Sequence, residues 1–178
     1  MNNRAKQLLV ACSLPVLILL GMCVTPLYTI LYGKEIILQT KPIDPSDMFR
    51  GDYVSLRYEA EEVPKSLVES AVLKAANDGQ TNFKVYVNLE KKGAVYTPSK
   101  VTLKKPDHGV YLNGNFSYMT PPDDQRDVAF IEYSLDKYFV PDNTGTKWEQ
   151  NATKGAVWAK VKVNNGYAVL TGIENKMP

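Results

Sequence analysis

The sequence predicts a β-rich α+β protein, in which one N-terminal transmembrane helix precedes a single antiparallel sheet or barrel-like outer domain with one packing helix. Three observations support this prediction. Residues 7–33 carry no charged side chain, residues 64–79 show apolar residues at helical spacing, and most of the remaining chain alternates apolar and polar residues over short stretches. A length of 178 residues suits one ordinary domain with a short appendage.

Residues 7–33 form the predicted membrane anchor, and residues 1–6 form a basic segment before it. A helix of this length, at about 1.5 Å per residue, can cross a hydrocarbon layer about 30 Å thick. No small-residue cleavage site follows the apolar run, and Met22 before Cys23 is too large for a lipobox. An uncut anchor is therefore favoured over the two alternatives, a cleaved signal peptide and a lipoprotein.

The charges predict the orientation and exclude some functions. Arg4 and Lys6 are the only charges before the span, so the positive-inside rule predicts a single-pass protein of the cell membrane with a cytoplasmic N-terminus. Residues 34–178 then form an extracytoplasmic domain. Two of the 21 basic residues precede the span, which leaves this domain with 19 basic and 19 acidic residues. Such a balance gives no basis for binding nucleic acid.

Cysteine and histidine are scarce. Cys12 and Cys23 both lie in the predicted span, so a disulfide or a cysteine-based zinc site in the outer domain is excluded. His108 is the single histidine, and its turn-like surroundings predict a solvated loop residue. We expect no metal and no cofactor.

The first part of the outer domain is predicted to form two strands followed by a helix. Residues 35–40 form the first predicted strand, and residues 53–59 the second, with Val54, Leu56 and Tyr58 on one face. A helix is expected to have Pro64 in its first turn and to stop at residues 77–79.

The rest of the chain is predicted to be mostly β. Further strands are expected at residues 83–89, 101–103, 110–112, 128–133, 157–163 and 167–173, giving seven or eight in all. Asn165-Gly166 indicates a type I′ hairpin between the last two.

A polar cluster just before the second strand is the best candidate site. It contains three carboxylates and a guanidinium within nine residues: Asp44, Asp47, Arg50 and Asp52. One interpretation is a hydrogen-bonded loop, since Asp, Pro and Gly form turns and arginine can bridge carboxylates. Two others are a ligand or partner site and a catalytic or oxygen-ligand cation site. The spacing of the three aspartates does not match the sequence pattern of an EF-hand loop.

The sequence that follows the cluster carries a family resemblance. Gly51-Asp-Tyr53-Val-Ser-Leu56-Arg-Tyr58 matches G-D-Y-x-x-L-x-Y at every specified position, and the chain resembles the GDYXXLXY family of membrane-anchored bacterial proteins. A second segment, Glu132–Glu149, is also similar to the family. It keeps Tyr138, Phe139, Val140, Pro141, Gly145 and Glu149, but has Ser134-Leu135-Asp136 where relatives have Gly-Ile-Glu. One interpretation is that Tyr138 and Phe139 pack at a strand end. The other is that Tyr138 and Glu149 form one surface with the first cluster.

We expect a non-enzymatic role, as an accessory or binding domain that partners a polytopic membrane protein. The anchor raises the effective concentration of the domain near membrane-resident partners, and the resemblance implies the same kind of partner. One alternative is a membrane-tethered envelope hydrolase using Asp44, Asp47 or Asp52 as acid and base. Another is an envelope glycan-binding module, with sugars stacked on Trp148 or Trp158.

Overall fold

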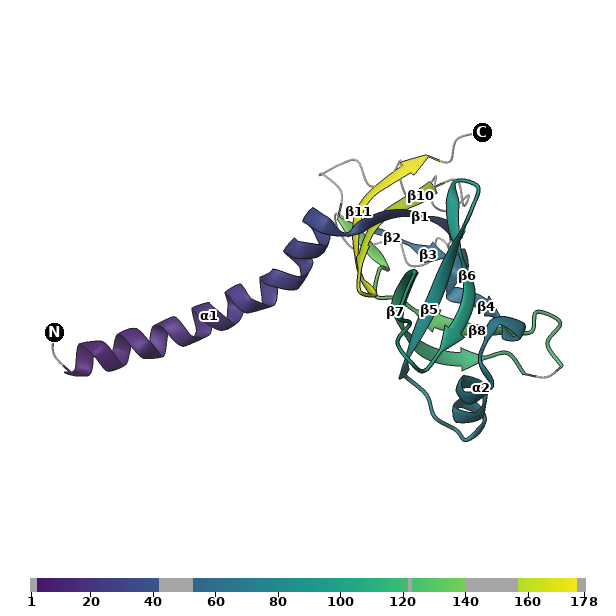
Figure 1. Cartoon of the computed structure of the whole chain (residues 1–178), viewed down its shortest axis with the longest axis horizontal. Helices are drawn as coiled ribbons and strands as arrows, with labels where there is room; N and C mark the ends of the chain where they lie inside the picture. The colour runs from purple at the N-terminus through teal and green to yellow at the C-terminus, as the bar shows by residue number, and fades with distance from the viewer. Residues whose placement is uncertain (1–2, 42–52, 122, 140–156, 176–178) are drawn as a thin grey trace.

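The computed structural model describes residues 3–41, 53–121, 123–139 and 157–175 (Figure 1). Within them the chain forms two α-helices and eleven β-strands, and the strands pair in antiparallel sheets. The first helix projects away from a β-rich body that contains all the strands. This arrangement confirms the predicted β-rich α+β fold with one N-terminal apolar helix and one packing helix. The strands exceed the expected seven or eight.

Helix α1 (Asn3–Tyr32) has the length and composition of a membrane span. Its segment Ala11–Tyr32 comprises 22 residues with a mean hydropathy of 2.1. Large apolar side chains are exposed along the segment, including Leu17 at 63% and Leu19 at 62%. Contiguous exposed apolar surface of this kind is typical of a segment that contacts a membrane or another protein. Both cysteines lie on it, exposed and unpaired.

The end of α1 is held closely against the sheet. Lys162 Nζ donates a hydrogen bond of 2.6 Å to Ile30 O, where a positive charge also offsets the negative end of the helix dipole. A Cβ added to Gly33 would lie 2.3 Å from Thr29 O and 3.2 Å from Val163 N. Only glycine therefore permits this approach. The next residue already begins the first strand, so no flexible linker separates the helix from the domain.

A four-stranded sheet follows directly on α1, in the order β11-β10-β1-β3. Its members are β1 (Lys34–Lys41), β3 (Arg57–Tyr58), β10 (Val157–Asn164) and β11 (Tyr167–Asn175). Alternate residues of β10 are buried, as its sequence predicts. Asn165 and Gly166 have φ values of 49° and 78°, which confirms the predicted type I′ hairpin between β10 and β11.

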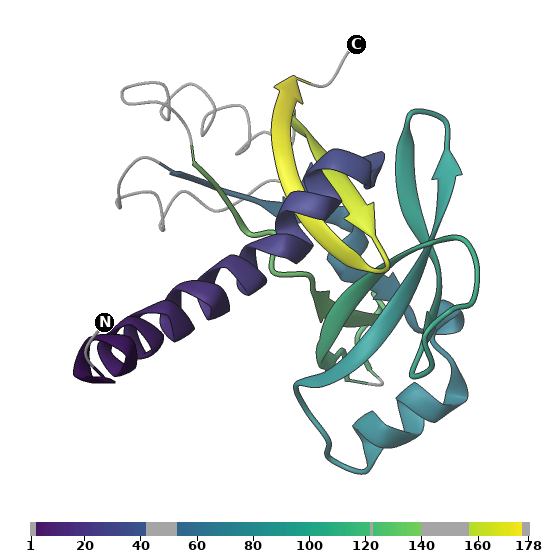
Figure 2. The ribbon, with the colours of Figure 1, turned by 60° about the vertical axis from the view of Figure 1, so that its left-hand side comes forward.

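A five-stranded sheet, in the order β4-β8-β7-β5-β6, makes up most of the remainder. Its strands are β4 (Glu62–Pro64), β5 (Phe83–Lys92), β6 (Val95–Thr102), β7 (Val110–Met119) and β8 (Val128–Glu132). The two sheets surround one core, because β1 lies against β6 and the Asn113 N–H donates to Gly166 O at 2.8 Å (Figure 2). The result approaches a barrel.

The packing helix α2 (Ser70–Asn77) begins later than its sequence indicates. Pro64 belongs to β4, which pairs with β8, and the Glu69 N–H donates to Val101 O. These tertiary hydrogen bonds use the backbone groups that a longer helix would need. The predicted end is correct: Gly79 has a φ of 83°, and the Gly79 and Gln80 N–H groups donate to Ala76 O and Ala75 O as in a Schellman motif.

The strand expected over residues 53–59 is wrong as one continuous element. It is divided into β2 (Tyr53–Ser55), which pairs with β9 (Lys137–Phe139), and β3, which pairs with β1. The break lies at Leu56, whose N–H donates to Asp136 O outside both ladders. Leu56 and Tyr58 are both buried and Arg57 is exposed, so the predicted alternation holds for these residues. The chain therefore changes partner strands within the motif.

Candidate functional site: the junction of two motif segments

The structure brings the two family-like segments together. In β2 and β9 the register pairs Tyr53 with Phe139, Val54 with Tyr138, and Ser55 with Lys137. The Leu56 N–H then donates a 2.8 Å hydrogen bond to Asp136 O. We call residues 53–61 together with residues 132–139 the motif junction. Its two halves are separated by more than 70 residues in the sequence, so only the tertiary fold unites them.

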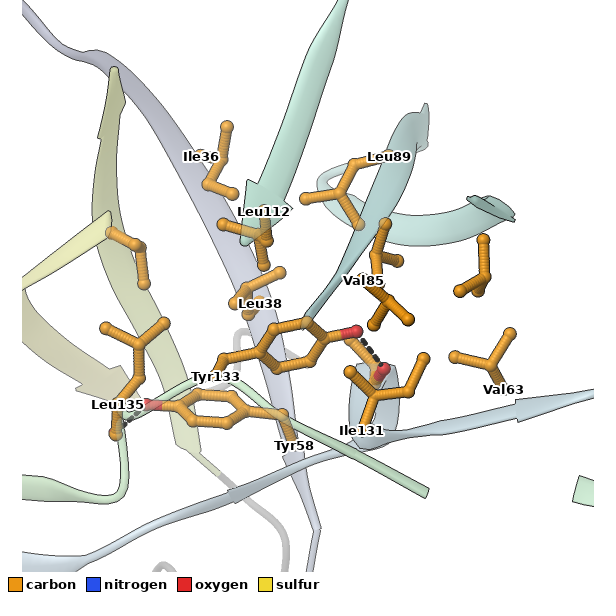
Figure 3. Close-up of a cluster of buried hydrophobic side chains, with 14 of the residues drawn as sticks. Ile36, Leu38, Tyr58, Val63, Val85, Leu89, Leu112, Ile131, Tyr133 and Leu135 are labelled. Atoms are coloured by element: carbon orange, nitrogen blue, oxygen red, sulfur yellow. Dashed lines mark hydrogen bonds between the residues drawn. The ribbon is translucent and has the colours of Figure 1, made fainter. Parts of the chain in front are cut away.

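Two buried tyrosines join the halves reciprocally (Figure 3). Tyr58, from the first segment, donates its hydroxyl proton to Leu135 O of the second at 2.7 Å. Tyr133, from the second, donates to Ala60 O just after the first at 2.6 Å. Burial raises the pKa of each hydroxyl above its usual value, with Glu61 adding to the effect, so both remain protonated donors. The junction is consequently a fixed arrangement.

Leu56 completes the apolar part of the junction. Its side chain is buried in the same core as Tyr58 and Leu135, and Tyr138 packs partly buried against that core. The leucine and the final tyrosine of the G-D-Y-x-x-L-x-Y pattern therefore have structural roles: one fills the core and the other bonds the second segment. This favours the packing interpretation for Tyr138.

A partly buried carboxyl lies beside the motif. Glu61 belongs to the short 3₁₀ helix η2 (Glu59–Glu61), and burial raises its pKa to about 7. The backbone of Tyr58, which hydrogen-bonds the carboxyl, and the charge of Arg57 lower the pKa, whereas Glu132 and Asp136 raise it further. The charge of Glu61 therefore changes near neutral pH.

Glu61→Gln is expected to raise the free energy of unfolding near pH 8 and to leave it almost unchanged near pH 5. The pKa of Glu61 in the folded protein, about 7, exceeds its ordinary value of 4.5. Between these values the folded state keeps a proton that the unfolded state has released, so stability falls as pH rises through that window. At pH values above this window, the loss in the free energy of unfolding is about 1–3 kcal/mol. The neutral amide of glutamine removes this loss.

Urea unfolding at about pH 5, 6.5 and 8 measures the effect. Glu90→Gln, at an exposed position near the end of β5, is the matched control for the same change of side chain outside the junction. An equal change at all three pH values for Glu61→Gln would contradict the burial of this carboxyl.

The whole of the predicted polar cluster lies outside the described residues. This applies to Asp44, Asp47, Arg50, Gly51 and Asp52, and in the second segment to Val140, Pro141, Gly145 and Glu149. The backbones of Tyr53 and Phe139 are described, in β2 and β9. Whether Glu149 joins the first cluster therefore stays a prediction. The strands that lead to both groups of residues, however, are paired with each other.

Other predicted residues are placed individually. His108 is exposed in the loop before β7, as expected of a solvated histidine. Trp158 is half-buried on β10, and its Nε1 is enclosed without a hydrogen-bond partner among the described residues. Trp148 lies outside them. Within the part of the chain that the structure describes, no group of three or more His, Cys, Asp or Glu residues is placed to hold a metal.

Sequence reasoning missed Glu61 and Tyr133 as junction residues. The run Glu59-Ala-Glu-Glu62 resembles a solvated acidic turn, and nothing in it distinguishes the one carboxyl that becomes buried. Tyr133 did carry a signal, because it ends the mostly apolar stretch from Val128 that is predicted to form a strand. No pattern in the sequence indicated its hydrogen-bond partner, Ala60 O, which is 73 residues away.

The position of the junction within the domain follows from strand contacts. Strand β9 contacts β11, and β11 also contacts α1. One strand, β11, therefore contacts both β9 of the motif junction and the apolar helix.

Comparison with known proteins agrees with the resemblance of the two segments. The family model described as GDYXXLXY protein matches residues 15–173, which include most of α1 and both halves of the motif junction. No curated protein and no solved structure matches the chain. Because the matched region covers most of its length, the chain belongs to the GDYXXLXY family.

Proposed function

We propose that this protein is a single-pass membrane protein whose outer domain is an accessory subunit of a polytopic membrane protein, bound through the motif junction. The observation that carries the proposal is the fixed connection between the junction, β11 and α1. A span that continues without a linker into the sheet holds the domain at one height and orientation over the bilayer. The junction then faces the same narrow zone that loops of a neighbouring membrane protein occupy.

The orientation in this proposal comes from the N-terminal charges. Arg4 and Lys6 precede the apolar helix, and the positive-inside rule keeps such residues in the cytoplasm. The domain that begins at Lys34 is then extracytoplasmic. Its balanced charge gives weak long-range steering, so a partner must be recognised by local contacts such as those of the junction.

In this proposal, the residues that flank the junction in the sequence supply its chemistry. Asp52 immediately precedes β2, and Pro141 follows shortly after β9. Carboxylates and an arginine that precede a paired strand in the sequence suit directional hydrogen bonds to a partner.

Copurification from membranes in a mild detergent tests the proposal. Wild-type full chain, carrying a C-terminal affinity tag, is compared with Asp52→Ala and with Asp107→Ala, a control at an exposed carboxylate in the loop before β7. We expect one polytopic protein to copurify stoichiometrically with wild type and Asp107→Ala, and to be lost with Asp52→Ala. Circular dichroism verifies that the variants are folded.

Two results would contradict the proposal. One is equal recovery of the partner with Asp52→Ala, and the other is the absence of any stoichiometric membrane partner. In the second case, an isosteric Asp52→Asn that abolishes turnover of envelope glycan or peptide would instead support the hydrolase alternative. Loss of glycan binding in Trp158→Ala would support the glycan-binding alternative.

A further inference from the structure

A polar pocket of about 410 Å³ lies where β5, β7 and β8 meet the turn between β10 and β11. Its polar and aromatic lining consists mainly of Lys84, Asn113, Asn115, Glu132, Ser134 and Tyr167. The pocket is separate from the β2–β9 ladder, although Glu132 and Ser134 belong to the second family-like segment.

The pocket lies at the end of the domain from which α1 departs. Strand β1 leaves the helix at Lys34, and β10 runs antiparallel to it, with Val163 opposite Lys34. The turn after β10 therefore extends past the start of β1, back toward the helix. Gly166 lies in the two-residue turn that follows Asn164, the last residue of β10. Figure 1 shows this turn on the side of the domain that faces α1.

A row of three side chains crosses the pocket wall. Lys84 on β5 pairs with Asn115 on β7, and Asn115 pairs with Glu132 on β8. Directly opposed residues project from the same face, so the ammonium, amide and carboxylate form one line across two strand spacings, about 10 Å. The cation and the carboxylate are thus held apart by the intervening strand.

The two charged side chains have other contacts. Lys84 Nζ lies 5.2 Å above the ring of Tyr86, and Glu132 Oε1 accepts a hydrogen bond of 3.2 Å from Ser117. Among the ion pairs of the described residues, none joins Lys84 to Glu132. A ligand that carries both a negative and a positive group complements this row better than a ligand of one sign.

We propose that this pocket binds the zwitterionic headgroup of a phospholipid, with the phosphate beside Lys84 and the ammonium group beside Glu132. Anionic lipids are typically bound by clusters of about four to eight basic residues, whereas this pocket offers one base and one acid. Tyr167, 41% exposed at the rim, suits the bilayer interface. The inference rests on the membrane anchoring in the proposed function, and it needs no protein partner.

Native mass spectrometry of the full chain in dodecyl maltoside tests this inference. Dilauroyl phosphatidylethanolamine and dilauroyl phosphatidylglycerol are offered at equal concentrations, and soluble glycerophosphoethanolamine serves as competitor. We expect preferential binding of phosphatidylethanolamine, displaced by the competitor. Lys84→Met should weaken it about fivefold, the effect of losing one exposed charge contact. Glu132→Gln should abolish the preference over phosphatidylglycerol, because the ammonium group loses its carboxylate.

The controls are Lys91→Met and Glu90→Gln, which replace an exposed lysine and an exposed glutamate at the far end of β5. Both should bind like wild type. Equal binding of the two lipids, failure of the soluble headgroup to compete, or equal effects of pocket and control variants would overturn the inference. Competition by a soluble headgroup requires neither a membrane nor a partner protein. Its failure is therefore distinguishable from loss of the partner in Asp52→Ala.

Discussion

Replacing Tyr58 with alanine is expected to lower the free energy of unfolding by about 3–5 kcal/mol, the usual cost of removing a buried aromatic side chain. Tyr58 is fully buried in the core, and its hydroxyl donates the 2.7 Å hydrogen bond to Leu135 O. The substitution leaves a cavity between the two halves of the motif junction and an unpaired carbonyl. Urea unfolding followed by circular dichroism measures the loss.

Two phenylalanine variants separate the hydroxyl from the ring. Tyr58→Phe should cost about 1–2 kcal/mol, because it removes one hydrogen bond and leaves Leu135 O buried without its donor. Tyr133→Phe should cost a similar amount through Ala60 O. In a double-mutant cycle, the two losses should show coupling, since both bonds hold the same two segments together. A change below about 0.3 kcal/mol for Tyr58→Phe would contradict the role of the reciprocal bonds.

Gly33→Ala is expected to destabilise the connection between α1 and the sheet by about 1–3 kcal/mol, the range for an overpacked site. The added Cβ would lie 2.3 Å from Thr29 O, a backbone atom that cannot move without shifting the last turn of the helix. The shift would also weaken the hydrogen bond from Lys162 to Ile30 O. Hydrogen exchange should become faster at the Gly33 amide position, whose N–H donates to Thr29 O.

The matched control is Gly172→Ala, in β11 of the same sheet. Its added Cβ would approach no atom closer than Lys160 Cβ at 4.0 Å, so it should change stability by less than about 0.5 kcal/mol. Equal effects of the two substitutions would show that the close approach at Gly33 does not hold the helix to the domain.

Local patterns in the sequence predicted the elements that depend on local residues. The alternation at residues 83–89 and 157–163 and the Asn165-Gly166 turn were correct, because strand faces and hairpin geometry follow from neighbouring residues. The start of α2 was wrong, since the residues after Pro64 use their backbone groups in tertiary contacts. No local pattern indicates such partners.

The motif junction was only partly predictable for the same reason. The sequence identified both segments, and it identified Leu56 and Tyr58 as residues that share a face. It could not identify the switch of strand partners at Leu56 or the two tyrosine bonds, because the contacting residues are separated by 73 to 80 residues along the chain, as in Tyr133 with Ala60 and Leu56 with Asp136. Glu61 is partly buried in the folded junction. The prediction that the polar residues from Asp44 to Asp52 form a site stays a prediction.

The proposed function depends above all on contact between the motif junction and a polytopic membrane protein. Site-specific photocrosslinking in intact membranes tests this most directly, with a benzoylphenylalanine residue at Asp136, exposed in the junction, or at Lys100, exposed on β6. We expect a crosslink to one polytopic protein from position 136 and none from position 100. No crosslink from position 136, or the same product from both positions, would contradict it.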